Sequence, residues 1–172
     1  MTYAVSLRLD ASLSEHIQWL WQVLAERGIS ASMLRLGYPP HLTLAVWDGP
    51  DASALLGSLQ RFAARLPSLP MRLAGLGLFP AERSVLWVAP AVGPELLAAH
   101  ADLHQTVGVE MNEHYRIDRW VPHCTLATDL EAAPVAAAVA VLAPLWRDAS
   151  GWVRAVDLVR FPPVEVLWGA GL

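Results

Sequence analysis

Two short segments of the sequence carry a histidine in the same local setting. Tyr38–Ala45 reads YPPHLTLA and Trp120–Ala127 reads WVPHCTLA, roughly 80 residues further along the chain. An imidazole titrates near neutral pH, so one ring can accept a proton while a second ring donates one. The pair His41 and His123 therefore predicts general acid and base catalysis.

Each histidine is followed, two residues later, by a threonine. On a strand, residues two apart point to the same face, so Thr43 shares a face with His41, and Thr125 shares one with His123. The hydroxyls can hydrogen-bond the non-bridging oxygens of a phosphodiester. Two such strands related by a pseudo-twofold axis would present all four side chains to one central cleft. The chemistry that this predicts is in-line displacement at phosphorus without a metal.

The hydrophobic pattern predicts elements that can hold these segments in place. On the second segment, Cys124 faces opposite His123, and we expect it to be buried and unreactive. On the first, Leu42, Leu44 and Val46 are expected to face helices. Ser12–Glu15 has the pattern of a capping box for the first helix, and Gly28 is its expected end.

The predicted strands are Tyr3–Leu9, His41–Trp47, Met71–Phe79, Ser84–Ala89, His123–Thr128, Trp152–Phe161 and Val164–Trp168. The predicted helices are Leu13–Gly28, Asp51–Leu66, Pro94–Val107 and Glu131–Leu145. Gly75 and Gly77 within the third strand indicate a bulge or a close backbone approach.

The order strand, helix, strand, helix, strand occurs twice along the chain, which favours an internal duplication. The predicted fold class is α+β: a bilobal, pseudo-twofold fold with an antiparallel sheet in each lobe around a central cleft, and helices outside. Residues 1–172 are expected to form one bilobal domain, with pseudo-repeat halves of roughly 2–80 and 84–169. Each half alone has too few strands to cover its helices.

Composition excludes several classes of protein. Hydrophobic residues make up 55% of the 172 residues and charged residues 16%, which excludes a disordered chain. The net charge is −4, so we expect no broad basic face for duplex DNA. The chain has no lysine, which excludes Schiff-base chemistry and a phosphate-loop lysine.

The composition and the N-terminal segment also indicate where the protein is expected to reside. Cys124 is the single cysteine, so no disulfide forms within the chain. Met1–Asp10 lacks the basic start of a signal peptide, and no stretch is long enough to span a membrane. The expected location is cytoplasmic, the oligomeric state is open, and no cofactor is expected.

The sequence resembles the two-histidine (2H) phosphoesterase superfamily, which includes the bacterial 2′-5′ RNA ligase-like proteins. The resemblance lies in the paired His-x-Thr-Leu motifs and in the order of Leu76–Phe79, Val85–Val88 and the helix before the second motif. The resemblance covers nearly the whole chain. It implies a bilobal fold without a metal, with His41 and His123 as the catalytic pair and Thr43 and Thr125 as phosphate ligands.

The implied activity is a metal-independent phosphodiesterase acting on small cyclic nucleotide phosphates, or on 2′,3′-cyclic or 2′-5′ linkages at an RNA 3′-end. RNA ligase-like members often have an arginine two positions after the second motif's leucine, where this chain has Thr128. RNA ligation therefore ranks below hydrolysis. A nucleotide- or RNA-end-binding module with little turnover, and a structural protein that binds partners, remain alternatives.

Other side chains are weaker candidates. Tyr38 and Trp120 precede the motifs and are candidate substrate contacts, although plain packing explains them equally well. Arg116 and Arg119, close in sequence to His123, are candidate phosphate contacts. His100 and His104 lie four residues apart on a predicted helix and could bind a metal, but no third ligand is evident, so we expect none. His114 is a weaker candidate for lining the cleft.

Overall fold

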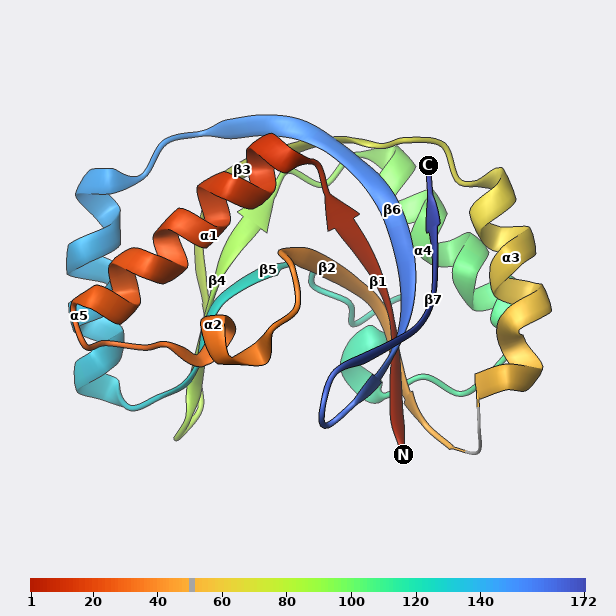
Figure 1. Cartoon of the computed structure of the whole chain (residues 1–172), viewed down its shortest axis with the longest axis horizontal. Coiled ribbons are helices and arrows are strands. Elements are labelled where there is room, and N and C mark those ends of the chain that lie inside the picture. The colour runs from red at the N-terminus through yellow and green to blue at the C-terminus, as the bar shows by residue number, and fades with distance from the viewer. Residues whose placement is uncertain (50–51) are drawn as a thin grey trace.

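The computed structural model describes residues 1–49 and 52–172, and its elements follow the predicted order (Figure 1). The strands are β1 (Thr2–Leu9), β2 (His41–Asp48), β3 (Pro70–Phe79), β4 (Ser84–Pro90), β5 (Cys124–Leu130), β6 (Ala149–Phe161) and β7 (Glu165–Gly171). The helices are α1 (Ala11–Glu26), α2 (Ser32–Leu36), α3 (Leu56–Arg65), α4 (Pro94–Val107) and α5 (Ala132–Leu142). Short 3₁₀ turns occupy Ala52–Leu55, Glu113–Tyr115 and Ala143–Leu145. The predicted start of the second helix, Asp51, lies outside the described residues.

The strands form an antiparallel sheet in the order β2-β1-β6-β3-β4-β5, with β7 paired to β6, which confirms the predicted α+β class. The long strand β6 connects the two parts of this sheet. Its first residues pair with β3, and the remainder runs between β1 and β7. In Figure 1, β6 arches across the molecule, and β2 and β5 come together beneath it.

The two parts of the sheet do not each correspond to one half of the sequence. β3 belongs to the first half but pairs with β4, whereas β6 belongs to the second half but pairs with β1. Each half thus contributes its third strand to the part of the sheet that the other half otherwise builds. The internal duplication and the halves 2–80 and 84–169 stay predictions.

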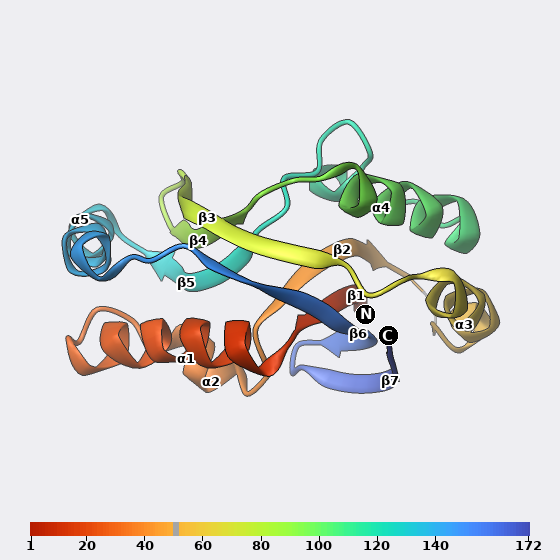
Figure 2. The same ribbon diagram turned by 90° about the horizontal axis from the view of Figure 1, so that it is seen from above.

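The helices lie outside the sheet in two groups (Figure 2). α1 contacts α5 at one end of the molecule, and α3 contacts α4 at the other end. Their apolar faces supply core side chains such as Ile17, Leu20 and Leu59, each without solvent exposure. Within the described residues, no helix is long and apolar enough to cross a membrane.

The first helix begins two residues earlier than a capping box at Ser12–Glu15 requires, so that prediction is wrong. The N-cap is Asp10, whose Oδ1 accepts a hydrogen bond from the backbone N–H of Leu13 at 2.9 Å. Its Oδ2 accepts the backbone N–H of Trp152 at 2.8 Å. Asp10 therefore caps α1 and ties it to β6. The predicted end is confirmed, because Gly28 follows α1 with a φ of 67°.

A bulge in β2 changes which side chains face the helices. The pairing with β1 shifts register between Val5 and Ser6, so that Leu44 is the extra residue between Thr43 and Ala45. Beyond the bulge, Val46 faces the same side as Thr43 and packs in a small cluster with Ala4, Tyr38 and Val159. The expectation that Val46 faces the helices is therefore wrong.

Gly77 is expected to tolerate no side chain, in keeping with the predicted close approach. A Cβ there would lie 2.4 Å from the indole ring of Trp87. Gly77→Ala should therefore lower the free energy of unfolding by about 1–3 kcal/mol, as overpacking does. Urea unfolding followed by far-UV circular dichroism measures the loss.

Gly75 provides the matched control on the same strand. It follows the register shift between Leu73 and Gly75, and a Cβ at this glycine would meet nothing within 4 Å. Gly75→Ala should leave the free energy of unfolding within about 0.5 kcal/mol of that of the parent protein. If the two variants lose equal free energy of unfolding, the contact with Trp87 is not what excludes a side chain at residue 77.

Candidate active site

The rings of His41 and His123 are held by matching hydrogen bonds. Nδ1 of His41 lies 2.8 Å from the carbonyl oxygen of Pro39, and Nδ1 of His123 lies 2.7 Å from that of Val121. Because a carbonyl only accepts, each Nδ1 carries the proton and donates it. Each Nε2 is then the basic nitrogen, and neither has a hydrogen-bond partner among the described residues.

The threonines share the face of their histidines. Along β2, His41 and Thr43 are partly exposed while Leu42 and Leu44 are buried, and the same alternation follows from His123, directly before β5, into that strand. The Thr43 hydroxyl lies 3.5 Å from the Ser6 hydroxyl on β1. The structure thus leaves both threonine side chains facing away from the core.

Two tryptophans fix the backbone at the threonines. The indole N–H of Trp120 donates to the carbonyl oxygen of Thr43, and that of Trp21 donates to the carbonyl oxygen of Thr125, both at 3.0 Å. Each bond reaches between distant parts of the chain. Both threonines are therefore held in place by donors that come from outside their own sheet ladder.

The two motifs lie against each other although β2 and β5 are not paired by ladder hydrogen bonds. The two strands are in contact, and the backbone of His41 acts on the thiol of Cys124, whose pKa it lowers slightly against the effect of burial. Cys124 is fully buried as expected, and burial raises the pKa of its thiol to about 12. A thiol with that pKa is a poor nucleophile at neutral pH.

Burial is the main influence on both candidate catalytic rings, and it lowers the pKa of each below the ordinary value of 6.5. His41 also experiences the charge of His123, which lowers its pKa further, and that of Asp157, which raises it. Both rings are mainly neutral at pH 7.

The surroundings of the two rings differ in spite of their matched hydrogen bonds. The ring of Tyr38 stands edge-on to that of His41, with 4.7 Å between the ring centroids, and the Tyr38 hydroxyl donates to Oδ2 of Asp157 at 2.8 Å. The ring of His123 instead lies near those of Phe79 and Trp87, with centroid separations of 4.9 Å and 6.0 Å. A carboxylate thus lies behind one histidine, and aromatic rings surround the other.

A pocket of about 190 Å³ opens beside the first motif. Its polar residues include His41, Thr43 and Ser6, and its apolar walls come from separate segments that include Tyr115 and Phe161. Ligand pockets combine apolar walls with a few polar groups in this way. The remaining lining residues are Ala4, Leu36, Tyr38, Val46, Val159 and Val164.

Trp120 is packed rather than available for stacking on a base. It is 9% exposed, its indole N–H is used by Thr43, and its ring stacks on His100 at 4.0 Å. Nε2 of His100 and Nε2 of His104 lie 3.1 Å apart, and both approach the carbonyl oxygen of Tyr115. The structure therefore gives these rings a packing role behind the first motif.

The other candidate contacts also have defined positions. Arg116 pairs with Glu110 at 2.9 Å and Arg119 with Glu113 at 3.2 Å, so each of these cations already has an acidic partner. His114 is exposed on the short 3₁₀ turn Glu113–Tyr115. Tyr38 is 5% exposed but still lines the pocket that contains His41.

Sequence reasoning missed the residues that β1 and β6 bring next to the first motif. Arg8 lies opposite His41 in the β1–β2 register, and Ser6 lies opposite Thr43. On the other side of β1, Ser6 is opposite Asp157 of β6. The strand pattern places Ser6 and Arg8 on one face, but no local signal shows that this face is shared with His41.

The family model of the 2′-5′ RNA ligase superfamily matches residues 10–163 of this chain. The protein therefore belongs to that superfamily, whose members are 2H phosphoesterases, and the expectation drawn from the paired motifs is confirmed at the level of the family. A search of curated proteins finds no match to this chain.

Solved structures share the fold over nearly the whole chain. E. coli LigT complexed with 3′-AMP has 18% identity and a TM-score of 0.61, with 99% of this chain and 96% of that chain covered. E. coli LigT complexed with ATP has 20% identity and a TM-score of 0.60, with coverage of 99% and 97%. Kluyveromyces marxianus Usb1 has 13% identity and a TM-score of 0.58, with coverage of 96% and 97%.

Proposed function

We propose that the protein is a metal-independent phosphodiesterase in which His41 and His123 act as general base and general acid. The observation that carries the proposal is the matched hydrogen bonding of the two rings, because it leaves both Nε2 atoms free for proton transfer. One Nε2 takes a proton from the attacking water. The other, protonated, gives its proton to the leaving oxygen.

The proposed step is hydrolysis of a 2′,3′-cyclic phosphate or a 2′-5′ linkage. The water oxygen forms a bond to phosphorus, and the bond between phosphorus and the ribose oxygen breaks. Thr43 and Thr125 hydrogen-bond the non-bridging oxygens in this proposal, which their position two residues after each histidine supports. Either histidine can serve as the base, depending on the direction in which the substrate binds.

A small substrate is favoured over a long RNA. The pocket beside His41 and Thr43 holds about 190 Å³, which suits one sugar or base. Arg116 and Arg119 are paired with glutamates, and Thr128 replaces a cation found in ligase-like members. The similar structures of LigT contain 3′-AMP or ATP, which are ligands of the same chemical class.

Product formation from 2′,3′-cyclic nucleotides in the presence of EDTA tests the proposal. Chromatography of the products should reveal a single nucleoside monophosphate, and EDTA should not change the rate. Calorimetry with the product nucleotide, run beside the assay, identifies a binding module. Binding without turnover would support the module and contradict the enzyme, while loss of turnover in EDTA would contradict metal independence.

The rate should be greatest in mildly acidic solution. Catalysis needs one neutral and one protonated ring, and burial lowers the pKa of both His41 and His123 below 6.5. The protonated ring is therefore scarce at pH 7 and becomes more abundant as the pH falls. We expect kcat/KM to peak below pH 6.5 and to fall about tenfold per pH unit on the alkaline side. An optimum above neutrality would contradict this assignment.

A further inference from the structure

The face that carries His41 and Thr43 continues across three more strands. His41 is opposite Arg8, which is opposite Ala155, which is opposite Gly171. In the next row, Thr43 is followed by Ser6, Asp157 and Gly169. Directly opposed residues point to the same side of a sheet. The first motif and these β6 and β7 residues therefore share one surface.

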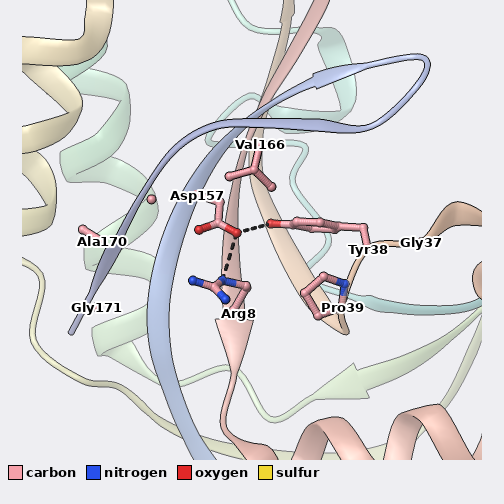
Figure 3. A pocket seen from close by; sticks show the side chains of 9 residues that line it. Arg8, Gly37, Tyr38, Pro39, Asp157, Val166, Ala170 and Gly171 are labelled. Carbon is pink, nitrogen blue, oxygen red and sulfur yellow. Dashed lines mark hydrogen bonds and ion pairs between the residues drawn. The ribbon is translucent and has the colours of Figure 1, made fainter.

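Arg8 is held on this surface by one edge of its guanidinium. Its Nε lies 2.9 Å from Oδ2 of Asp157 as an ion pair, and the same oxygen accepts the Tyr38 hydroxyl at 2.8 Å (Figure 3). Nη1 and Nη2 of Arg8 have no partner within the described ranges 1–49 and 52–172. The Arg8 side chain is 40% exposed, whereas that of Asp157 is 3% exposed.

The exposed edge of Arg8 lies in a pocket of about 320 Å³, which Figure 3 shows between the segment before β2 and strand β7. Gly37–Pro39 line one side, and Val166 with Gly169–Gly171 line the other. Residue 169 has no room for a side chain, because a Cβ would lie 2.5 Å from Oδ1 of Asp157. Tyr38 also lines the pocket of His41, so its ring stands between the two.

The chemistry of this pocket suits an anion. Arg8 carries the positive charge among its lining residues, and a guanidinium edge with two N–H groups matches two phosphate oxygens. The carboxylate of Asp157 is buried and does not offer a free negative charge to the pocket. Its Oδ2 is already used by Arg8 and Tyr38, and its Oδ1 is buried without a hydrogen-bond partner.

We propose that Arg8 and this pocket form a subsite for a second phosphate group of the substrate, remote from the phosphate that is cleaved. The inference rests on the proposed function. Neighbouring strands are about 4.8 Å apart, so Arg8 on β1 lies one strand spacing from His41 on β2, and Asp157, which its guanidinium reaches on β6, lies about 10 Å from β2. Two phosphates on opposite sides of one ribose fit within this range. The subsite thus selects nucleotides that carry a 5′-phosphate, with the sugar passing over Tyr38.

A matched pair of substrates tests the subsite: adenosine 2′,3′-cyclic phosphate with and without a 5′-phosphate. The parent protein should have a lower KM for the 5′-phosphorylated compound. Arg8→Gln should raise that KM at least tenfold and change the KM of the other compound less than twofold. Arg154→Gln is the control, because Arg154 lies on the neighbouring strand β6 and outside the pocket, where it contacts Ser68 and Trp152.

The outcomes separate this inference from the proposed function. If the parent protein turns over neither compound, the proposed function is contradicted. Turnover of both compounds with equal KM, or an equal effect of Arg8→Gln on the two, overturns the subsite alone. If Arg8→Gln melts below the assay temperature, Arg8→Lys replaces it, since lysine keeps a charge beside Asp157 but lacks the two-pronged edge. A KM ratio unchanged in Arg8→Lys then overturns the subsite.

Discussion

Replacing His41 or His123 with asparagine is expected to lower kcat about 10³-fold, within the range that a positioned general acid or base contributes. The asparagine amide can still donate to the carbonyl of Pro39 or Val121, which each Nδ1 approaches within 2.8 Å or less. The substitution therefore removes Nε2 and keeps the local hydrogen bond. Initial rates with a 2′,3′-cyclic nucleotide measure the effect.

His114→Asn is the control, because His114 is exposed and lies outside the pocket of the first motif. It should keep at least half of the parent activity. The double variant of His41 and His123 should be little worse than either single variant, since the two rings act in one proton-transfer step. Full activity in either single variant, with unchanged melting, would remove that ring from the mechanism.

Much of the fold was accessible from the sequence because its elements are strongly periodic. Pro94–Val107 is a helix with the predicted bounds, and Gly77 lies under Trp87 as a close approach. The predicted start of α1 is wrong because two N-caps are possible in the sequence. The carboxylate of Asp10 accepts the backbone N–H of Leu13, and the capping-box pattern at Ser12 is not used. The predicted orientation of Val46 is wrong because a bulge reverses the alternation of side chains along β2.

The candidate site was only half visible in the sequence. His41 and Thr43 are linked by spacing along one strand, and the same holds for His123 and Thr125, so a local pattern reveals each pair. Arg8 joins them through antiparallel pairing, whose register no local pattern specifies.

The partners of the candidate contacts were equally hidden. The indole N–H of Trp120 donates to the carbonyl oxygen of Thr43, and Arg116 pairs with Glu110. The chain makes both contacts only in the folded structure. A residue's type shows which interactions it can make. The tertiary structure decides which of them are already occupied.

The threonines should matter in a way that separates phosphate binding from packing. Thr43→Val and Thr125→Val keep the shape of the side chain and remove its hydroxyl. The backbone bonds from Trp120 and Trp21 are unaffected, since they use the threonine carbonyls. Loss of one preorganised donor to the transition-state anion typically costs about 10²–10³ in rate, so we expect kcat/KM to fall about 100-fold in each variant.

Serine at the same positions distinguishes the hydroxyl from the rest of the side chain. Thr43→Ser and Thr125→Ser retain the donor and lose one methyl group, and we expect each to keep at least a third of the parent kcat/KM. Steady-state kinetics of the four variants with one cyclic substrate, together with their melting temperatures, gives the comparison. If valine keeps the parent rate and serine lowers it, the methyl group and not the hydroxyl is the contributing part. The two threonines would then support the fold of the site without binding phosphate.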